Sequence, residues 1–432
     1  FQVLLFLQVF FTAQPENRLS VALTFGVLAA LAWGLYGLYR AAQRTAYELE
    51  TLVFLLISIG AAVTAAYDPD SLLKLVCTVV IGMVLFLLMS GVLRSLHRSI
   101  QARWPVAVAA GVLLAFNVVL GERIFGAKNW ISIGPLSFQP SELVKIAFVL
   151  VGAATLDRLF AKRNLIFTIL FSAYCVGCLA LMSDFGTALI FFVAFLCIAF
   201  LRTGDLPSIA MMVAAAAFGC GIILRFKPYI ADRFAAWGHV WDYAQDMGYQ
   251  QTRTMSAMAS GGLFGVGPEA GWLKYVGAAN TDLVFGVVGE EFGFLLALCC
   301  VAAMALPIVF TLRCAAVARS SFYTILSCAT AAMLVCQMAL NVLGAVDLLP
   351  LTGVTFPFVS MGGSSMISCW GLMAYLKAAD TRQNASFALR APKLAPEKKA
   401  PASKPKAPSR EGFFADRPDI PVDDIFGKED RK

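Results

Sequence analysis

The sequence predicts an all-α protein built as a polytopic bundle of transmembrane helices. Of its 432 residues, 59% are hydrophobic and only 14% are charged, whereas soluble domains are roughly half apolar and about a quarter charged. A soluble protein of this composition could not cover its own surface, which excludes an ordinary cytosolic enzyme and also a disordered or collagen-like chain. At roughly 20 residues per crossing, the length allows about ten to twelve spans.

Twelve apolar runs set the order of the predicted helices. The first run begins at Phe1, without Met and inside an apolar stretch, so we expect the chain to be truncated there. Pro307 and Pro357 lie within two later runs, where neighbouring helices can satisfy the freed backbone groups. The runs fall at about 1–13, 19–39, 50–67, 70–92, 105–121, 141–157, 164–182, 184–201, 206–225, 283–310, 320–346 and 352–377.

Lysine and arginine indicate the orientation of the bundle, since the cytoplasmic loops of membrane proteins are rich in both. The opposite loops are far longer and have fewer cations for their length. We therefore expect the cation-rich set to face the cytoplasm, the C-terminus to lie inside, and the loops at 122–140 and 226–282 to lie outside. The cation-rich loops are 40–49, 91–104, 158–163, 202–205 and 311–319.

Charge and cysteine content argue against several other kinds of site. The net charge of +7 is not a nucleic-acid signal, because in a membrane protein the positions of the cations matter more than their sum. The cysteines lie almost entirely in apolar runs and none lies in the loop 226–282, so no disulfide framework is indicated. His97 and His239, the only two histidines, lie in different loops, which argues against a histidine-based metal site.

The composition changes from about residue 380, where proline, lysine, alanine and serine dominate. Such a segment cannot bury a core, so we expect 380–432 to form a disordered cytoplasmic tail. Its end, residues 419–426, is either a docking peptide or plain solvated tail.

The first outer segment places charges where a membrane protein normally avoids them. Pro140 suits the first turn of a helix, and Glu142 suits the positive end of that helix. Lys145 follows three residues later on nearly the same face. Two interpretations stay open: a capped helix with a snorkelling lysine, or a cation at the outer membrane surface that holds an anionic lipid headgroup.

The long loop 226–282 is predicted to be ordered and to lie along the membrane interface, because tryptophan and tyrosine recur in it. Residues 260–267 are glycine-rich but lack the Gly-Lys-Ser/Thr ending of a phosphate-binding loop. We therefore expect close-packed, re-entrant backbone there rather than a nucleotide site. The aromatic residues are Trp237, Trp241, Tyr243 and Tyr249.

The third outer feature is Asp282, which lies directly before the span that begins at Leu283. Thr281 or Asp282 could cap that helix. With lysines, arginines and aromatic residues on the same outer face, Asp282 also becomes a candidate general base.

The helix after Asp282 is predicted to carry a glycine face. Gly286, Gly289 and Gly293 lie within about 40° of Asp282 on a helical wheel, so another backbone can approach closely there. Glu290 and Glu291 lie about 12–13 Å deeper and must face protein or water, or be protonated.

Together, and in this order, these motifs resemble the SEDS family (shape, elongation, division and sporulation), which includes RodA-, FtsW- and SpoVE-like proteins. The resemblance covers about 50–378 and ten spans, with the first two runs (residues 1–45) as additional N-terminal helices on a core over 46–379. The motifs are Gly126-Ala127-Lys128-Asn129-Trp130-Ile131, Phe138-Gln139-Pro140-Ser141-Glu142, Asp184-Phe185-Gly186-Thr187-Ala188, Gly248-Tyr249-Gln250, Ser260-Gly261-Gly262-Leu263-Phe264-Gly265, Thr281-Asp282, Gly289-Glu290-Glu291-Phe292-Gly293, Leu351-Thr352-Gly353-Val354 and Pro357-Phe358-Val359-Ser360-Met361-Gly362-Gly363-Ser364-Ser365.

The resemblance implies a peptidoglycan glycosyltransferase that polymerises lipid II on the outer face of the bacterial cytoplasmic membrane. It also implies two kinds of partner: a class B penicillin-binding protein, and other membrane proteins of the elongation or division machinery. The essential loop aspartate of the family corresponds to Asp282, and its motif tryptophan to Trp130.

The residues themselves suit such chemistry. Asp282 could take the proton from the acceptor hydroxyl in an inverting transfer. The leaving lipid pyrophosphate needs cations, supplied by the protein or by a divalent ion such as Mg²⁺ or Mn²⁺ held in part by Asp282. The candidate substrate-binding residues are Arg123, Lys128, Trp130, Glu142, Lys145, Asp184, Arg253 and Lys274.

Four positions depart from the pattern usual in the family. Arg253 stands for a common glutamine and Lys274 for a common acid, which makes the outer loop more basic. Asn280 stands for a histidine, and Asp347 for a small or apolar residue. The additional N-terminal spans resemble RodA-like proteins of high-GC Gram-positive bacteria and favour elongation over division.

Two other functions are compatible with the sequence. A flippase or transporter for lipid-linked precursors could use Asp184, Glu290 and Glu291 as relay groups near membrane depth, although the same residues could equally cap helices and form interhelical hydrogen bonds. A non-catalytic scaffold is the third possibility. Purified protein with lipid II separates them, because only the polymerase forms glycan strands.

Overall fold

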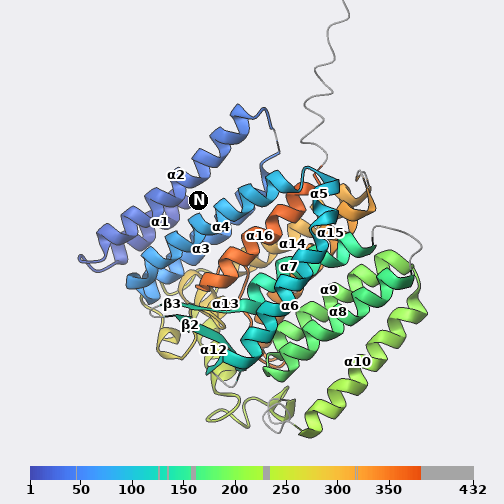
Figure 1. The fold of residues 1–432 in the computed structure, drawn as a ribbon. Coiled ribbons are helices and arrows are strands. Elements are labelled where there is room, and N and C mark those ends of the chain that lie inside the picture. Colours follow the sequence, from blue (N-terminus) through green and yellow to red (C-terminus); the bar gives the residue numbers. More distant parts are fainter. Residues whose placement is uncertain are drawn as a thin grey trace, which may run out of the picture. The chain divides into compact units, whose positions relative to one another are not determined.

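Helices form in all twelve apolar runs, and the prediction of an all-α membrane bundle is confirmed (Figure 1). The bundle is multi-pass, as the apolar lengths require. In chain order the helices are α1 (Gln2–Thr12), α2 (Arg18–Ala41), α3 (Glu48–Tyr67), η1 (Pro69–Ser71), α4 (Leu72–Val92), α5 (Leu96–Gln101), α6 (Arg103–Leu120), α7 (Pro140–Leu156), α8 (Lys162–Leu181), α9 (Phe185–Thr203), α10 (Leu206–Phe226), α12 (Tyr249–Gly261), η2 (Leu273–Tyr275), α13 (Val284–Val287), the π-helix η3 (Val288–Phe292), α14 (Phe294–Ala316), α15 (Ser321–Ala345) and α16 (Gly363–Ala378).

The computed structural model describes residues 1–44, 46–124, 127–133, 136–156, 162–226, 234–316, 318 and 320–380. The chain divides into the units Phe1–Ser386 and Phe387–Lys432, and the helices belong to the first. Several predictions therefore fall outside the described residues: the tail from 381 onward with its possible docking peptide, Gly126, and part of the loops at 158–163 and 311–319.

Eight helices among the described residues are long and apolar enough to cross a membrane by themselves. The remaining apolar runs form α1, α7, α10 and α16, of which α7 has 17 residues and α16 has 16. The eight are Arg18–Ala41, Glu48–Tyr67, Pro69–Val92, Arg103–Leu120, Asn164–Leu181, Phe185–Thr203, Phe294–Ala315 and Ser321–Ala345.

The protein core lies around α3, α15 and α16. In an 18-residue apolar stretch of each candidate span, 83% of the residues are buried in α3 and 67% in α15. In the other six candidate spans the share is 22–44%. Helix α16 packs against α4, α7 and α15, and Trp370 at its centre touches the rings of Phe54, Phe86 and Phe358. The peripheral helices keep one apolar face outward, as expected where lipid is the solvent.

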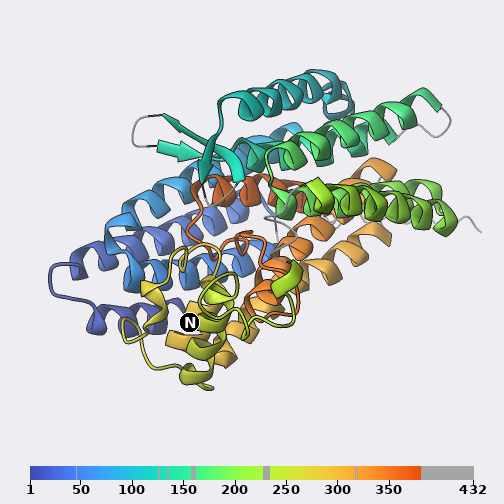
Figure 2. The ribbon, with the colours of Figure 1, turned by 90° about the horizontal axis from the view of Figure 1, so that it is seen from below.

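A small antiparallel sheet, which the sequence did not lead us to expect, follows α6. Strands β1 (Glu122–Ile124), β2 (Ala127–Ile133) and β3 (Leu136–Phe138) pair in the order β1-β2-β3. The strands and the segment 234–293 lie at the same end of the helix bundle (Figures 1 and 2). The outer segments therefore gather where the candidate site is expected.

Two predicted spans are interrupted rather than continuous. The run 283–310 turns sharply at Gly293, whose φ is 90°, after the π-helix η3. The run 352–377 is not helical before Gly363. Within its first part, Gly353 and Phe358 have φ of 69° and 64°, and Pro357 lacks the N–H that a helix would need. These breaks create the non-helical backbone that borders Asp282.

The additional helices α1 and α2 pack against α3. The Tyr39 hydroxyl of α2 donates to Glu50 of α3 at 2.8 Å. Glu50 in turn forms a buried ion pair with Lys377 of α16 at 2.9 Å, and the Lys377 ammonium lies 5.0 Å from the centre of the Tyr39 ring. All eleven cysteines are free in the structure.

Replacing Gly60 tests the close packing of α3. A Cβ atom at Gly60 would lie 2.4 Å from the carbonyl oxygen of Val359, which is backbone and cannot move aside cheaply. We expect Gly60→Ala to destabilise the fold by about 1–3 kcal/mol, measured as a lower thermal midpoint of the detergent-solubilised protein. Gly34→Ala is the matched control, because nothing lies within 4 Å of a Cβ there. Equal melting of the two variants would contradict this packing.

Candidate functional site

We call residues 234–282 the outer segment, after the side of the membrane expected for them from the sequence. Asp282 lies at its end, where it enters α13, and is half-buried. Its N–H donates to the carbonyl of Ala278 at 2.9 Å, and Ala278 itself has a φ of 62°. The N-cap of α13 is Leu283, so neither Thr281 nor Asp282 occupies the capping position that the sequence suggested. The backbone turns tightly at Ala278. Helix α13 then begins at Val284, one residue after the start predicted for this span.

Three consecutive carbonyls at Asp282 are held by donors from the last part of the chain. The amide of Met361 donates to the carbonyl of Asn280 at 3.0 Å. The Ser360 hydroxyl donates to the carbonyl of Thr281 at 2.6 Å, and the Asn341 side-chain amide donates to the carbonyl of Asp282 at 2.8 Å. We call these three bonds the carbonyl clamp; it fixes the backbone that carries the carboxylate.

Gly353 forms a wall beside the Asp282 carboxylate. A Cβ atom at Gly353 would lie 3.3 Å from Oδ2 of Asp282, and the φ of 69° at this position favours glycine. Gly353 is exposed while Asp282 is half-buried. The carboxylate therefore lies beside exposed backbone, where a ligand can approach it without crossing the core.

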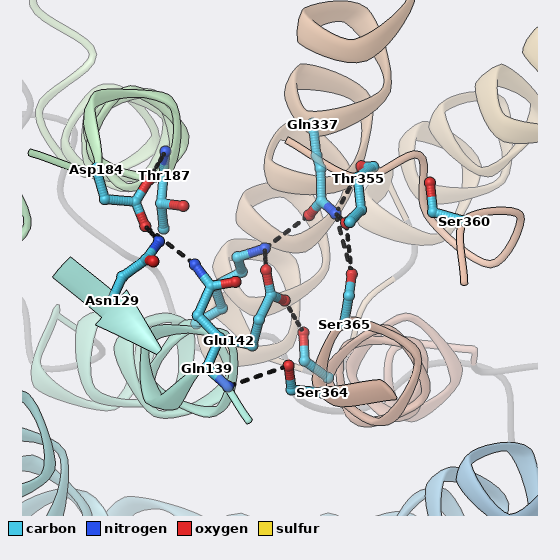
Figure 3. Close-up of polar contacts among 12 residues, drawn as sticks. Asn129, Gln139, Glu142, Asp184, Thr187, Gln337, Thr355, Ser360, Ser364 and Ser365 are labelled. Atoms are coloured by element: carbon cyan, nitrogen blue, oxygen red, sulfur yellow. Dashed lines mark hydrogen bonds and ion pairs between the residues drawn. The ribbon is translucent and has the colours of Figure 1, made fainter. Parts of the chain in front are cut away.

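A buried polar network reaches Thr355, two residues after Gly353 in the chain (Figure 3). Lys145 is fully buried and donates to Glu142 and to Gln337, each at 2.8 Å. The amide of Gln337 donates to the carbonyl of Thr355 at 3.0 Å, one residue after Val354. Lys145 thus neither snorkels to the surface nor lies at the surface as a free cation. Its charge is balanced inside the bundle, where Ser368 also donates to Glu142 at 3.0 Å.

Asp184 caps α9 and fixes the sheet to it. Its carboxylate accepts the N–H of Thr187 at 3.1 Å, which satisfies a helix donor. It also accepts the side-chain amides of Asn129 at 2.8 Å and Gln139 at 3.0 Å (Figure 3). Asp184 therefore joins β2, α7 and α9.

Lys128, Trp130 and Arg123 lie in the sheet. The Lys128 ammonium donates to the carbonyls of Val118 and Val119 at 3.0 and 3.1 Å, at the negative end of α6. Arg123 is exposed and pairs with Lys128 in the β1–β2 register, while the half-buried Trp130 pairs with Glu122. Two cations thus sit side by side on one strand pair.

Arg253 and Lys274 belong to the outer segment, and both are half-buried. The Arg253 guanidinium lies 5.3 Å from the centre of the Tyr249 ring. Lys274 donates to the carbonyl of Glu269 at 2.6 Å and lies 5.6 Å from the centre of the Tyr275 ring. Each cation is thus placed against an aromatic ring that is itself partly exposed.

The glycine-rich run packs backbone to backbone against the π-helix η3, as predicted. Val266 and Gly267 donate their amides to the carbonyls of Glu290 and Glu291 at 2.9 and 3.0 Å. A Cβ atom at Gly265 would lie 2.2 Å from the carbonyl oxygen of Glu291. Only glycine allows this approach.

The predicted glycine face of the helix after Asp282 is covered by α12. Cβ atoms at Gly286 and Gly289 would meet Thr254 and Met258 of that helix. Glu290 faces protein, and its carboxylate accepts the amides of Trp272 and Leu273 at 2.9 and 3.0 Å. This carboxylate orders the segment that carries Lys274.

Sequence reasoning missed the residues that hold Asp282. In the sequence, Asn341 is a polar residue inside an apolar run, a pattern that suggests interhelical hydrogen bonds, and Ser360 and Gly353 lie in motifs without an assigned role. The unusual Asp347 also has a defined place: its carboxylate accepts the amide of Gly238 at 3.1 Å, and the Gln251 side-chain amide lies 3.5 Å away. Asp347 ties the outer segment to the end of α15.

Comparison with known proteins shows the family of the chain. A family model described as a cell cycle protein, FtsW/RodA/SpoVE, matches residues 44–385. The chain belongs to this family. The SEDS resemblance is thereby confirmed, and α1 and α2 precede the matched residues.

Relatives within the family carry both of its common names. The chain is 30% identical over 276 residues to a probable peptidoglycan glycosyltransferase FtsW of Borreliella burgdorferi, covering 61% of this chain and 74% of that protein. It is 30% identical over 337 residues to the peptidoglycan glycosyltransferase RodA of Mycobacterium leprae, covering 73% and 70%.

Solved structures show the same fold. A chain from a peptidoglycan synthase complex that coordinates polymerisation and crosslinking matches with a TM-score of 0.64 at 27% identity, covering 78% of this chain and 98% of that one. The rod shape determining protein RodA of Thermus thermophilus matches with a TM-score of 0.58 at 25% identity, covering 77% and 95%.

The candidate residues fall into separate groups. Asp282 lies in the carbonyl clamp, beside the network of Glu142 and Lys145. Asp184 is bonded to β2, where Lys128 and Trp130 lie, and Gln139 and Ser364 connect this group with the start of α16 (Figure 3). The remaining candidates, which lie on strand β1 or in the outer segment, are Arg123, Arg253 and Lys274.

Removing the Lys145 ammonium tests its place in the buried network. Lys145→Met leaves Glu142 as an unpaired buried charge, so we expect the free energy of unfolding to fall by about 3–5 kcal/mol. The measurement is the denaturation of the solubilised protein. Glu142→Gln/Lys145→Met removes both charges and should recover most of that loss, and the control Lys74→Met, at an exposed position, should melt as wild type. A stable Lys145→Met single variant would contradict the buried pair.

Proposed function

We propose that this chain is a peptidoglycan glycosyltransferase that polymerises lipid II into glycan strands at the outer face of the bacterial cytoplasmic membrane. The observation that carries the proposal is the half-buried carboxylate of Asp282, which is held by the carbonyl clamp and reachable past Gly353. Membership of the FtsW/RodA/SpoVE family and relatives named peptidoglycan glycosyltransferases support the same reaction.

In the proposed reaction, Asp282 acts as the general base. It takes the proton from the 4-hydroxyl of the acceptor sugar while that oxygen attacks C1 of the donor sugar. The bond between C1 and the pyrophosphate oxygen breaks, its electron pair leaves with undecaprenyl pyrophosphate, and the configuration at C1 inverts. A fixed carboxylate supports this role because catalysis depends on the geometry of the reacting groups.

Cations are needed where the pyrophosphate leaves. Arg123 and Lys128 on the sheet, and Arg253 and Lys274 on the outer segment, are placed to meet an anionic substrate, since Arg123 is exposed and the other three are only half-buried. Lys145 is buried in its ion pair, so we assign it to holding the site in shape rather than to direct contact with phosphate.

A divalent ion such as Mg²⁺ or Mn²⁺ fits this site only with help from the substrate. Among the described residues, no group of three or more His, Cys, Asp or Glu side chains is placed to hold a metal. Asp282 would supply one carboxylate oxygen, and pyrophosphate and water would supply the rest, a ligand set that Mg²⁺ commonly accepts. The bound ion would neutralise charge on the leaving group.

The flippase alternative receives less support. Two of its three relay candidates, Asp184 and Glu290, each accept two or more hydrogen bonds from the protein. Such bonds suit helix capping and loop ordering better than a group that must exchange protons. We retain precursor movement without polymerisation as an outcome of the test below.

A membrane-bound transpeptidase, a class B penicillin-binding protein, is the proposed partner. The support is the matched structure, which comes from a complex of polymerisation and crosslinking. Members of the family serve either cell elongation or cell division, and the additional helices α1 and α2 favour elongation. Other membrane proteins of the elongation machinery are then further proposed partners.

Asp282→Asn tests the catalytic assignment. The amide keeps the size of the side chain and cannot accept the proton, so we expect lipid II polymerisation to fall by at least about 10²-fold with unchanged melting. Glycan products from purified protein and lipid II, with the transpeptidase partner present, give the measurement. Asp246→Asn is the control, because Asp246 is an exposed carboxylate of the same outer segment. Polymerisation by Asp282→Asn at the wild-type rate would rule out the base, and precursor movement in liposomes without glycan would favour the flippase.

Chelation tests the divalent ion. We expect EDTA to lower the polymerisation rate and Mg²⁺ or Mn²⁺ to restore it, without a change in the thermal midpoint, because the ion would be held mainly by the substrate. Full activity after exhaustive chelation would show that the protein cations alone balance the leaving group.

A further inference from the structure

We propose that Asn341 is a positioning residue for the Asp282 carboxylate, an inference that rests on the proposed function. The side chain of Asn341 projects from α15 and is 1% exposed. Its Nδ2 donates to the carbonyl of Asp282 and to the carbonyl of Val354, both at 2.8 Å. One amide group therefore bonds the aspartate and also the segment that forms the wall in front of it.

The orientation of the amide is set by its partners. Both groups that Asn341 meets are carbonyl oxygens, which can only accept, so the NH₂ end must face them. The Oδ1 atom of Asn341 is buried and has no hydrogen-bond partner among the described residues. A buried unsatisfied oxygen carries a cost. The amide thus gives both of its N–H groups to the site and leaves its own acceptor unused.

Asn341 reaches the carbonyl of Asp282 from another helix, at the point where the chain enters α13. The amides of Gly286 and Val287 both donate to the carbonyl of Leu283, so the hydrogen bonds of the helix begin one residue after Asp282. A helix that began one residue earlier would bond this carbonyl within itself. Without Asn341, this carbonyl would lose the donor, and the turn at Asp282 would be held less firmly, by the other two bonds of the carbonyl clamp and by the bond from its own N–H to Ala278.

The second bond sets the distance to the wall. Val354 directly follows Gly353, where a Cβ atom would lie 3.3 Å from Oδ2 of Asp282. Because the same nitrogen bonds the carbonyls of Asp282 and Val354, the distance between the Asp282 carboxylate and the wall at Gly353 is held constant. A substrate hydroxyl approaching past Gly353 would meet the carboxylate at a fixed position. A misplacement of about 1 Å can lower the rate by roughly 10²-fold.

The test replaces Asn341 in the full-length protein together with its transpeptidase partner. Asn341→Leu keeps the shape of the side chain and removes both donors, so we expect kcat for lipid II polymerisation to fall about 10²-fold while KM changes by less than about twofold. Thr330→Val is the matched control on α15: Thr330 is fully buried and its hydroxyl bonds only the carbonyl of Leu326 in its own helix. This variant should keep the wild-type kcat.

Hydrogen–deuterium exchange supplies a readout that does not depend on activity. In Asn341→Leu, we expect faster exchange in peptides covering 278–287 and 351–356, and wild-type exchange in peptides around Thr330. If Asn341→Leu does not fold, Asn341→Ser decides, because its single hydroxyl can donate to one of the two carbonyls and should give an intermediate kcat.

The outcomes separate this inference from the proposed function. Wild-type kcat with unchanged exchange in the folded Asn341 variants would overturn the positioning role and leave the polymerase intact. If wild-type protein formed no glycan with its partner, the proposed function would fail. Faster exchange at 278–287 in Asn341→Leu would then still show that Asn341 positions Asp282, but for a reaction other than polymerisation.

Discussion

The arrangement of the site depends on three backbone carbonyls that precede α13 and therefore lie outside its hydrogen bonding. Inside a bundle with little water, such groups must find donors elsewhere. They find them in Asn341, Ser360 and the amide of Met361, contributed by α15 and by the non-helical segment before α16. Breaking the last apolar run at its start costs helix hydrogen bonds, but it provides the backbone that fixes Asp282.

The buried charges extend this arrangement into the core. Lys145 and Glu142 neutralise each other, and Gln337 connects them to the carbonyl of Thr355, close to the wall at Gly353. Breaking a buried pair is costly because it strands a charge in low dielectric. The rigid interior therefore supports a half-exposed carboxylate, while the cations proposed to meet the substrate stay on the sheet and the outer segment.

Much of the bundle could be predicted from the sequence because apolar length is a local property. Asp282 could be singled out too, as a charge entering a glycine-faced span. The placement of Lys145 could not, since its partner Gln337 lies 192 positions away. Nor could the role of Asn341, which bonds a residue 59 positions earlier, or the sheet, whose outer strands have three residues each. Hydrogen bonds between distant segments leave no periodic signal.

The most direct measurement is a structure of the protein with its partner and a lipid II acceptor and donor bound. We expect the acceptor 4-hydroxyl oxygen within about 2.6–3.2 Å of an Asp282 carboxylate oxygen, with the donor C1 on the far side of that hydroxyl and the carbonyl clamp intact. A productive complex in which the reacting hydroxyl met another base, with Asp282 remote from both sugars, would contradict it.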